Sequence, residues 1–155
     1  MTLQVGDKAP QFTLPDTSRE DVSFPMDPAQ NVVLLFVPLA FSGVCTAELC
    51  DVSQGLSAYE DLGARVLAIS VDSPFALKSW SDQEGITLTL LSDFNKEVSA
   101  AYGAQYDDFI GLKGVAKRSA FVIDKEGVIR HASVSDDPTV LPDFEAIQAC
   151  LRTLE

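Results

Sequence analysis

The pattern of apolar and polar positions predicts strands that alternate with helices. Two continuous apolar runs, at 31–37 and 65–71, are rich in β-branched residues and are typical of strands buried on both faces of a sheet. Between these runs, apolar residues recur at steps of three and four, which predicts one helix over 44–62. A second helix is expected over 74–84, with Pro74 in its first turn.

Shorter segments complete the chain, and glycine, proline and aspartate separate them. They predict a hairpin of strands at 12–14 and 22–24, strands at 87–91, 119–123 and 128–134, and helices at 95–102 and 141–154. This order predicts an α/β fold with a mixed central β-sheet flanked by helices and an N-terminal β-hairpin. No linker, repeat or low-complexity segment interrupts the pattern, so we expect residues 1–155 to form a single domain.

Composition then narrows the classes of function. The chain has 11 Lys and Arg residues against 23 Asp and Glu residues, a net charge of −12, and its cations are scattered. No nucleic-acid partner is expected, because neutralising phosphates requires clustered cations. The most apolar run, 32–41, is shorter than the roughly 20 residues of a membrane span, and residues 1–7 show no basic or apolar leader. We therefore expect a cytoplasmic protein that does not enter a membrane.

The stretch 38–45 carries the candidate chemistry. It follows a predicted buried strand and leads into a helix, so Cys45 lies in the first helical turn, where free N–H groups and the helix dipole favour a thiolate. Ser42 can offer a hydroxyl to the sulfur or to an oxygen bound beside it. Pro38 has no N–H and can shield a pocket from water. The alternative is that Cys45 is a small core residue, as free cysteines often are.

The motif Pro38-x-x-x-Ser42-x-x-Cys45 resembles the active-site motif of the peroxiredoxins, cysteine-based peroxidases with a thioredoxin-like fold. Other segments resemble family landmarks in the family's order: 6–14, 68–73 with Trp80, 90–93 with 101–103, and 118–124. The stretch 38–41 and the Glu48-Leu49 pair look closest to the alkyl hydroperoxide reductase E group. The threonine of the family motif is replaced by Ser42, which keeps the hydroxyl.

The resemblance implies roles for three residues. Cys45 would be the peroxidatic cysteine, whose thiolate attacks a hydroperoxide and becomes a sulfenic acid. Arg118 would stabilise the negative charge of the transition state, and Glu48 would hold Arg118 in place. Judged on the residues alone, Arg118 belongs to a solvated Lys-Arg pair and Glu48 is an ordinary partner of the helix dipole.

Cys50 follows Cys45 at the C-x-x-x-x-C spacing of the Q-type (bacterioferritin comigratory) subgroup, in which this position carries the resolving cysteine. Five helical steps place Cys50 about 140° around from Cys45, on the polar face of the helix, where a purely structural cysteine is less expected. Their Cα atoms would lie roughly 8–9 Å apart, beyond the ~7 Å limit for a disulfide. A bond between them therefore requires the first turns to unwind. The alternative is that Cys50 is idle and an external thiol resolves Cys45.

Four other residues have less specific interpretations. Cys150 is expected to pack in the core and His131 to lie at the surface. Trp80 is either a core residue or, as the resemblance implies, a pocket wall or dimer contact, and Phe41 lines either the pocket or a dimer face. The cysteine spacings argue against a zinc site.

The sequence and the resemblance together predict a thiol-dependent peroxidase that acts on hydrogen peroxide and organic hydroperoxides without a cofactor. A thioredoxin-like or glutaredoxin-like dithiol would recycle it, and the resemblance implies a homodimer. A peroxide-sensing redox relay protein is the alternative. A disulfide exchanger is disfavoured, because the predicted helix does not begin with C-x-x-C.

Overall fold

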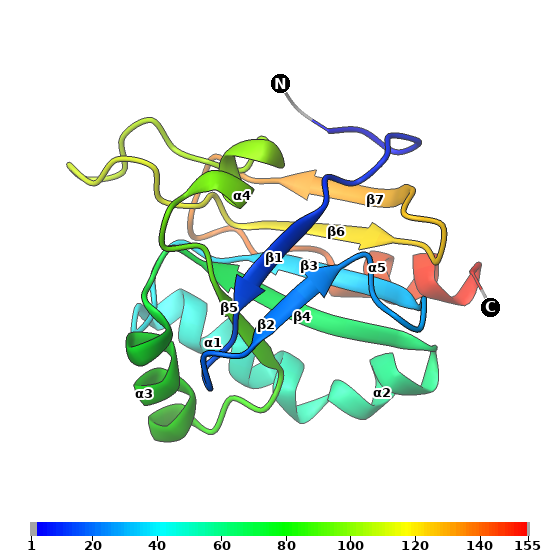
Figure 1. Cartoon of the computed structure of the whole chain (residues 1–155), viewed down its shortest axis with the longest axis horizontal. Coiled ribbons are helices and arrows are strands. Elements are labelled where there is room, and N and C mark those ends of the chain that lie inside the picture. The colour runs from blue at the N-terminus through cyan, green and yellow to red at the C-terminus, as the bar shows by residue number, and fades with distance from the viewer. Residues whose placement is uncertain (1–2, 155) are drawn as a thin grey trace.

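The computed structural model describes residues 3–154 and has a five-stranded mixed sheet at its centre (Figure 1). Its strands are β3 (Asn31–Phe36), β4 (Ala64–Ser70), β5 (Thr89–Ser92), β6 (Ser119–Ile123) and β7 (Ile129–Val134). The strand order is β5-β4-β3-β6-β7, in which β3, β4 and β5 run parallel while β6 pairs antiparallel with both β3 and β7. The predicted mixed sheet is therefore confirmed.

Each face of this sheet is covered by a different layer. The helices are α1 (Gly43–Gln54), α2 (Leu56–Asp61), α3 (Pro74–Glu84), α4 (Glu97–Ala101) and α5 (Phe144–Arg152). Val33 and Leu35 of β3 pack with α1, α3 and α5, whereas Leu34 and Phe36 pack toward α4 and the β1–β2 hairpin. Alternation of side chains along a strand thus explains why the whole β3 run is apolar.

The N-terminal hairpin consists of β1 (Phe12–Pro15) and β2 (Asp21–Phe24), and it crosses in front of the sheet in Figure 1. The rings of Phe12 and Phe24 stack with centroids 5.6 Å apart and bury this face of the sheet. The hairpin agrees with the sequence-based expectation.

The single helix expected over 44–62 is wrong, because the chain forms α1 and α2 with a break at Gly55. Gly55 has φ −99° and ψ 17°, outside the helical region, and glycine is a poor residue in a helix interior. The strand expected from residue 87 begins only at Thr89, because the N–H of Thr87 donates to Oγ of Ser53 at 3.0 Å. The last two helices are shorter than expected, and α5 starts late because Asp143 caps it by accepting the N–H of Ala146 at 3.1 Å.

The parallel strands β3, β4 and β5 end at the same edge of the sheet. The loop 37–42 follows β3 and leads into α1, while 71–73 follows β4 and 93–96 follows β5. Residues far apart in sequence are therefore close together at this edge. Within 3–154, no helix is long and apolar enough to span a bilayer.

Candidate active site

The helix α1 begins at a serine whose side chain leaves the leading N–H groups uncapped. Ser42 has extended backbone angles, φ −73° and ψ 147°, and its carbonyl accepts the N–H of Thr46 at 2.9 Å. Its Oγ donates to the carbonyl of Leu39 at 2.9 Å and makes no capping bond to the helix. The N-terminal amides of α1 therefore keep their positive potential for an anion, and Cys45 lies in this turn.

A buried guanidinium joins three of the candidate residues. Arg118 is almost fully buried, and its Nη2 donates to Sγ of Cys45 at 3.1 Å while its Nη1 donates to Oε1 of Glu48 at 2.6 Å. Its Nε donates to the carbonyl of Pro138 at 2.8 Å, so all its nitrogens are held. Cys45 and Glu48 are three residues apart on α1 and share the helix face toward Arg118. The expected cluster of cysteine, glutamate and arginine is thus present.

Burial has the largest effect on the ionisation of Glu48, the carboxyl beside Arg118. It raises the pKa of Glu48 to about 7, although the charge and hydrogen bond of Arg118 act in the opposite direction. The Oε2 atom of Glu48 has no hydrogen-bond partner among residues 3–154. Burial alone would lower the pKa of Arg118, but Cys45 and Glu48 raise it, so the guanidinium stays charged. At neutral pH one fixed cation therefore faces the sulfur of Cys45 and a half-protonated carboxyl.

A pocket of about 210 Å³ opens beside this cluster. Its lining comes from the start of α1, the loop before it and three later segments: Pro38, Leu39, Ser42, Gly43, Val44, Phe109, Arg118, Pro138 and Thr139. Most of these residues are apolar, and Pro38 is buried. The structure thus places Pro38 and Ser42 in one pocket with Arg118, while Cys45 is fully buried in contact with the guanidinium.

The sequence analysis did not identify the pocket residues that come from later loops. Phe109 forms part of the wall, and its ring stacks on Tyr106 with centroids 5.0 Å apart. Pro138 holds Arg118 through its backbone carbonyl. Every residue has a carbonyl, so no residue-type signal in the sequence identifies such an acceptor.

The two aromatic candidates take different positions. Trp80 is fully buried in the core between the sheet and the helices, and its Nε1 donates to Oγ1 of Thr46 at 3.0 Å. It is therefore a core residue that anchors the first turns of α1. Phe41 is 48% exposed and packs against Trp80 with ring centroids 6.3 Å apart, and it is absent from the pocket lining.

Cys50 lies on the polar side of α1, as expected, but α3 packs against this side. Cys50 is half-buried, and its Sγ donates to the carbonyl of Glu84, at the end of α3, at 3.5 Å. One turn before Cys50, Oγ1 of Thr46 accepts the Nε1–H of Trp80, and one turn after it, Oγ of Ser53 accepts the N–H of Thr87. We call this contact the α1–α3 seam: Thr46, Cys50 and Ser53 against Trp80, Glu84 and Thr87. Burial, followed by the nearby carboxylates of Glu84 and Asp51, raises the pKa of the Cys50 thiol.

The other cysteine and the histidine lie near α5. Cys150 is half-buried and packs against the helix-side core, which confirms its expected packing role. His131 was expected at the surface, but it is half-buried and its Nε2 is buried without a hydrogen-bond partner in the described chain. Because burial lowers the pKa of His131, the neutral imidazole is favoured. The reason is that α5 packs on β6 and β7.

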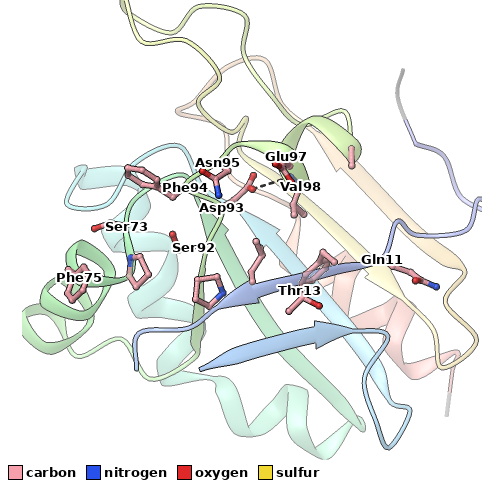
Figure 2. Close-up of a pocket in the computed structure, with 15 residues that line it drawn as sticks. Gln11, Thr13, Ser73, Phe75, Ser92, Asp93, Phe94, Asn95, Glu97 and Val98 are labelled. Atoms are coloured by element: carbon pink, nitrogen blue, oxygen red, sulfur yellow. Dashed lines mark hydrogen bonds between the residues drawn. The ribbon is translucent and has the colours of Figure 1, made fainter. Parts of the chain in front are cut away.

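A second and larger pocket of about 620 Å³ lies between β1, the start of α3 and the loop after β5 (Figure 2). Its buried acid, Asp93, accepts the N–H groups of Val98 at 3.1 Å and Ser99 at 2.8 Å. That carboxylate is therefore engaged in starting α4. No cysteine or cationic side chain lines this pocket, so it is not a second candidate for thiol chemistry.

Comparison with protein families gives a match to the AhpC/TSA family over residues 5–132. The chain belongs to this family of peroxiredoxins. This peroxiredoxin is 42% identical to alkyl hydroperoxide reductase E of Mycobacterium tuberculosis over 135 residues, which cover 85% of this chain and 86% of that protein. It is 36% identical over 165 residues to peroxiredoxin TSA1 of Saccharomyces cerevisiae, with 100% and 80% of the two chains covered.

The fold comparison agrees with the family. A peroxiredoxin-like protein from Aquifex aeolicus has a TM-score of 0.90 and 26% identity, over 100% of this chain and 90% of that one. The fold is thioredoxin-like, with the mixed sheet, flanking helices and N-terminal hairpin described above. Peroxiredoxins are peroxidases, and membership of the family supports thiol-dependent peroxidase activity in this chain.

Replacing Glu48 by Gln should change how stability depends on pH. The pKa of Glu48 is raised in the folded state, so the folded protein binds the extra proton and loses stability as pH rises from about 4.5 to 7. Over that pH range, the free energy of unfolding of the native protein should fall by roughly 3 kcal/mol more than that of Glu48→Gln. Urea unfolding of both proteins at pH 4.5 and 7.5 measures it. Equal pH dependence of the two unfolding free energies would contradict the raised pKa.

Proposed function

We propose that the protein reduces hydrogen peroxide and organic hydroperoxides with Cys45 as the nucleophile. The observation that carries this proposal is the 3.1 Å hydrogen bond from the buried Arg118 to Sγ of Cys45, at a helix N-terminus and beside a pocket. Cationic donors and helix amides both stabilise a thiolate, which is the reactive form of cysteine.

The proposed reaction is a displacement at oxygen. The Cys45 thiolate attacks the terminal oxygen of the hydroperoxide, so that an S–O bond forms while the O–O bond breaks. Cys45 is oxidised to a sulfenic acid, and the peroxide is reduced. The departing alkoxide or hydroxide takes up a proton and leaves as alcohol or water. Arg118 stabilises the negative charge that spreads over the sulfur and both oxygens.

The remaining candidates support this step in different ways. The Ser42 hydroxyl donates to a backbone carbonyl, so its lone pairs are available to accept the O–H of a hydroperoxide. Pro38 excludes water from the pocket without adding an N–H. Glu48 positions Arg118 through their 2.6 Å ion pair. Trp80 supports the first turns of α1 from the core.

Replacing Cys45 by Ser should abolish peroxide reduction, because a serine hydroxyl is not ionised at neutral pH. Stopped-flow mixing of the reduced protein with hydrogen peroxide and with an organic hydroperoxide measures the second-order rate constant. Cys150→Ser is the matched control, since Cys150 packs away from the pocket, and its rate should equal that of the native protein. Peroxide consumption that persists in Cys45→Ser would refute the proposal.

For recycling, we propose that Cys50 resolves the Cys45 sulfenic acid and that a thioredoxin-like or glutaredoxin-like dithiol reduces the resulting disulfide. Both cysteines lie within the intact helix α1 and are free thiols, so the bond requires unwinding of its first turns. A reducing compartment such as the cytoplasm suits a protein whose cysteines are free. The competing route is resolution by an external thiol, which the half-buried position of Cys50 and its raised pKa favour.

Replacing Cys50 by Ser distinguishes the two routes. If Cys50 resolves Cys45, the variant should keep its first reaction with peroxide but lose at least about 90% of thioredoxin-dependent turnover, because the sulfenic acid has no internal partner. Peroxide consumption coupled to thioredoxin oxidation measures turnover, and mass spectrometry of the peroxide-treated protein shows whether a disulfide forms. Unchanged turnover would establish the external route.

We propose a homodimer that uses the carboxyl edge of the parallel strands. Phe41, Phe75 and Phe94 follow β3, β4 and β5 at this edge and are 48%, 67% and 62% exposed. Phe75 and Phe94 line the same surface pocket. Large exposed aromatic groups on one edge are typical of an interface rather than of free surface.

Replacing Phe94 by Asp should therefore weaken self-association at least tenfold, because a charge would be buried in the interface. Sedimentation equilibrium or light scattering over a range of concentrations measures the dimer dissociation constant. Val5→Asp is the matched control: Val5 is 61% exposed, and its neighbour Gly6 bonds Ile129 at the opposite end of the sheet. Equal effects of both variants would contradict an interface at the carboxyl edge.

A further inference from the structure

An aspartate outside the pocket ties the active-site loop to the sheet. Asp72 follows β4, and its Oδ2 accepts the N–H of Ala40 at 2.7 Å and the hydroxyl of Ser70 at 2.8 Å. The Ser70 hydroxyl oxygen also accepts the N–H of Asp72 at 3.2 Å. Ser70 is almost fully buried, so the carboxylate is held in one orientation before it reaches the loop.

The backbone around Asp72 is fixed from the other side as well. Its carbonyl accepts the hydroxyl of Ser92, at the end of β5, at 2.6 Å. The carbonyl of Ser70 accepts the N–H of Asp93 at 2.7 Å. The ends of β4 and β5 are thus bonded to each other, and Asp72 extends this rigid unit to the loop that follows β3.

The loop that Asp72 contacts is the one that carries Pro38 and Ser42. Ala40 lies midway between them, and Phe41 has a left-handed backbone with φ 67°. A residue with a side chain adopts that conformation at a cost of order 1 kcal/mol, so other contacts must hold it. The last sheet-type bond of this strand is from Val37 N–H to the Ile69 carbonyl. After it, the Ala40 N–H is the loop's bond to the neighbouring strand end.

We propose that Asp72 is a positioning residue for hydroperoxide reduction: by holding Ala40 it keeps Pro38 and Ser42 in place against Arg118 across the pocket. This inference rests on the proposed peroxidase function. Asp72 does not line the pocket and does not bond Cys45 or Arg118, so it acts only through the loop. Displacements of about 1 Å far from the reacting atoms can cost about 100-fold in rate.

The test separates loop position from thiol reactivity. Asp72→Ala should lower the second-order rate constant with hydrogen peroxide by about 10- to 100-fold. Alkylation of Cys45 by iodoacetamide, followed by site-resolved mass spectrometry, should stay within about twofold of the native rate, because alkylation needs the thiolate but not the peroxide contacts of Ser42. Asp72→Asn keeps an oxygen for the Ala40 N–H and should restore most of the peroxide rate.

Two further variants control for effects on folding. Asp124→Ala removes a carboxylate that likewise accepts backbone N–H groups, those of Glu126 and Val128, but at the opposite end of the sheet. Its peroxide rate should be unchanged. Ser70→Ala removes one bond to Asp72 with little change in volume, so it tests the same idea if Asp72→Ala does not fold. It should lower the peroxide rate several-fold and leave alkylation unchanged.

Each outcome decides the inference. A normal peroxide rate in Asp72→Ala, or in Ser70→Ala if the first variant does not fold, would overturn it while leaving the proposed function intact. If Asp72→Ala lost peroxide reduction and alkylation to the same extent, and Asp72→Asn rescued neither, Asp72 would serve only in folding. That result would also overturn the inference. Failure of the native protein to react with peroxide through Cys45 would instead refute the function itself.

Discussion

The site depends on the burial of one cation. Taking a guanidinium out of water is costly unless opposite charge and hydrogen bonds compensate for the lost solvation. Arg118 obtains this compensation from Cys45 and Glu48 on α1 and from the carbonyl of Pro138 after β7. Because these partners come from separate segments, the cation that faces the sulfur is in place only when α1, the start of β6 and the loop after β7 are packed together.

The helix that carries the cysteine is covered on two sides. Its apolar stripe, with Leu49 and Val52, packs toward the sheet, and the α1–α3 seam bonds its polar side to α3. A net contribution of about 1 kcal/mol for each seam hydrogen bond keeps the helix closed in the thiol state. Opening the first turns of α1, which the proposed Cys45–Cys50 disulfide requires, would break seam bonds and the contacts to Arg118. The same seam therefore stabilises the proposed nucleophile and limits its resolution.

The pattern of apolar residues and prolines in the sequence predicted those helices and strands whose position follows from one physical rule. The continuous apolar run of β3 implies burial on both faces, and Pro74 marks the start of α3. The cluster around Arg118 was found because its residue types carry a motif. The polar side on which Cys50 lies was predicted, but its contact with α3 was not, because periodicity tells which residues are polar and not which element packs on them. The roles of the Pro138 carbonyl and the Ala40 N–H could not be predicted, because nearly every residue type has these backbone atoms.

The strongly acidic composition is compatible with the proposed thiolate at Cys45, because the surface charges and Arg118 act over different distances. Exposed charges are largely screened beyond about 8 Å at physiological ionic strength, so most of the net charge of −12 does not reach the sulfur. The Arg118 guanidinium, by contrast, donates to the sulfur at 3.1 Å and is buried with it, so solvent ions screen this contact far less. The neighbouring Glu48 disfavours the thiolate when it is ionised, and its raised pKa keeps it partly neutral at pH 7. The charge state of the site is thus decided by the geometry of one arginine and one carboxyl, and the acidic surface remains free to serve solubility.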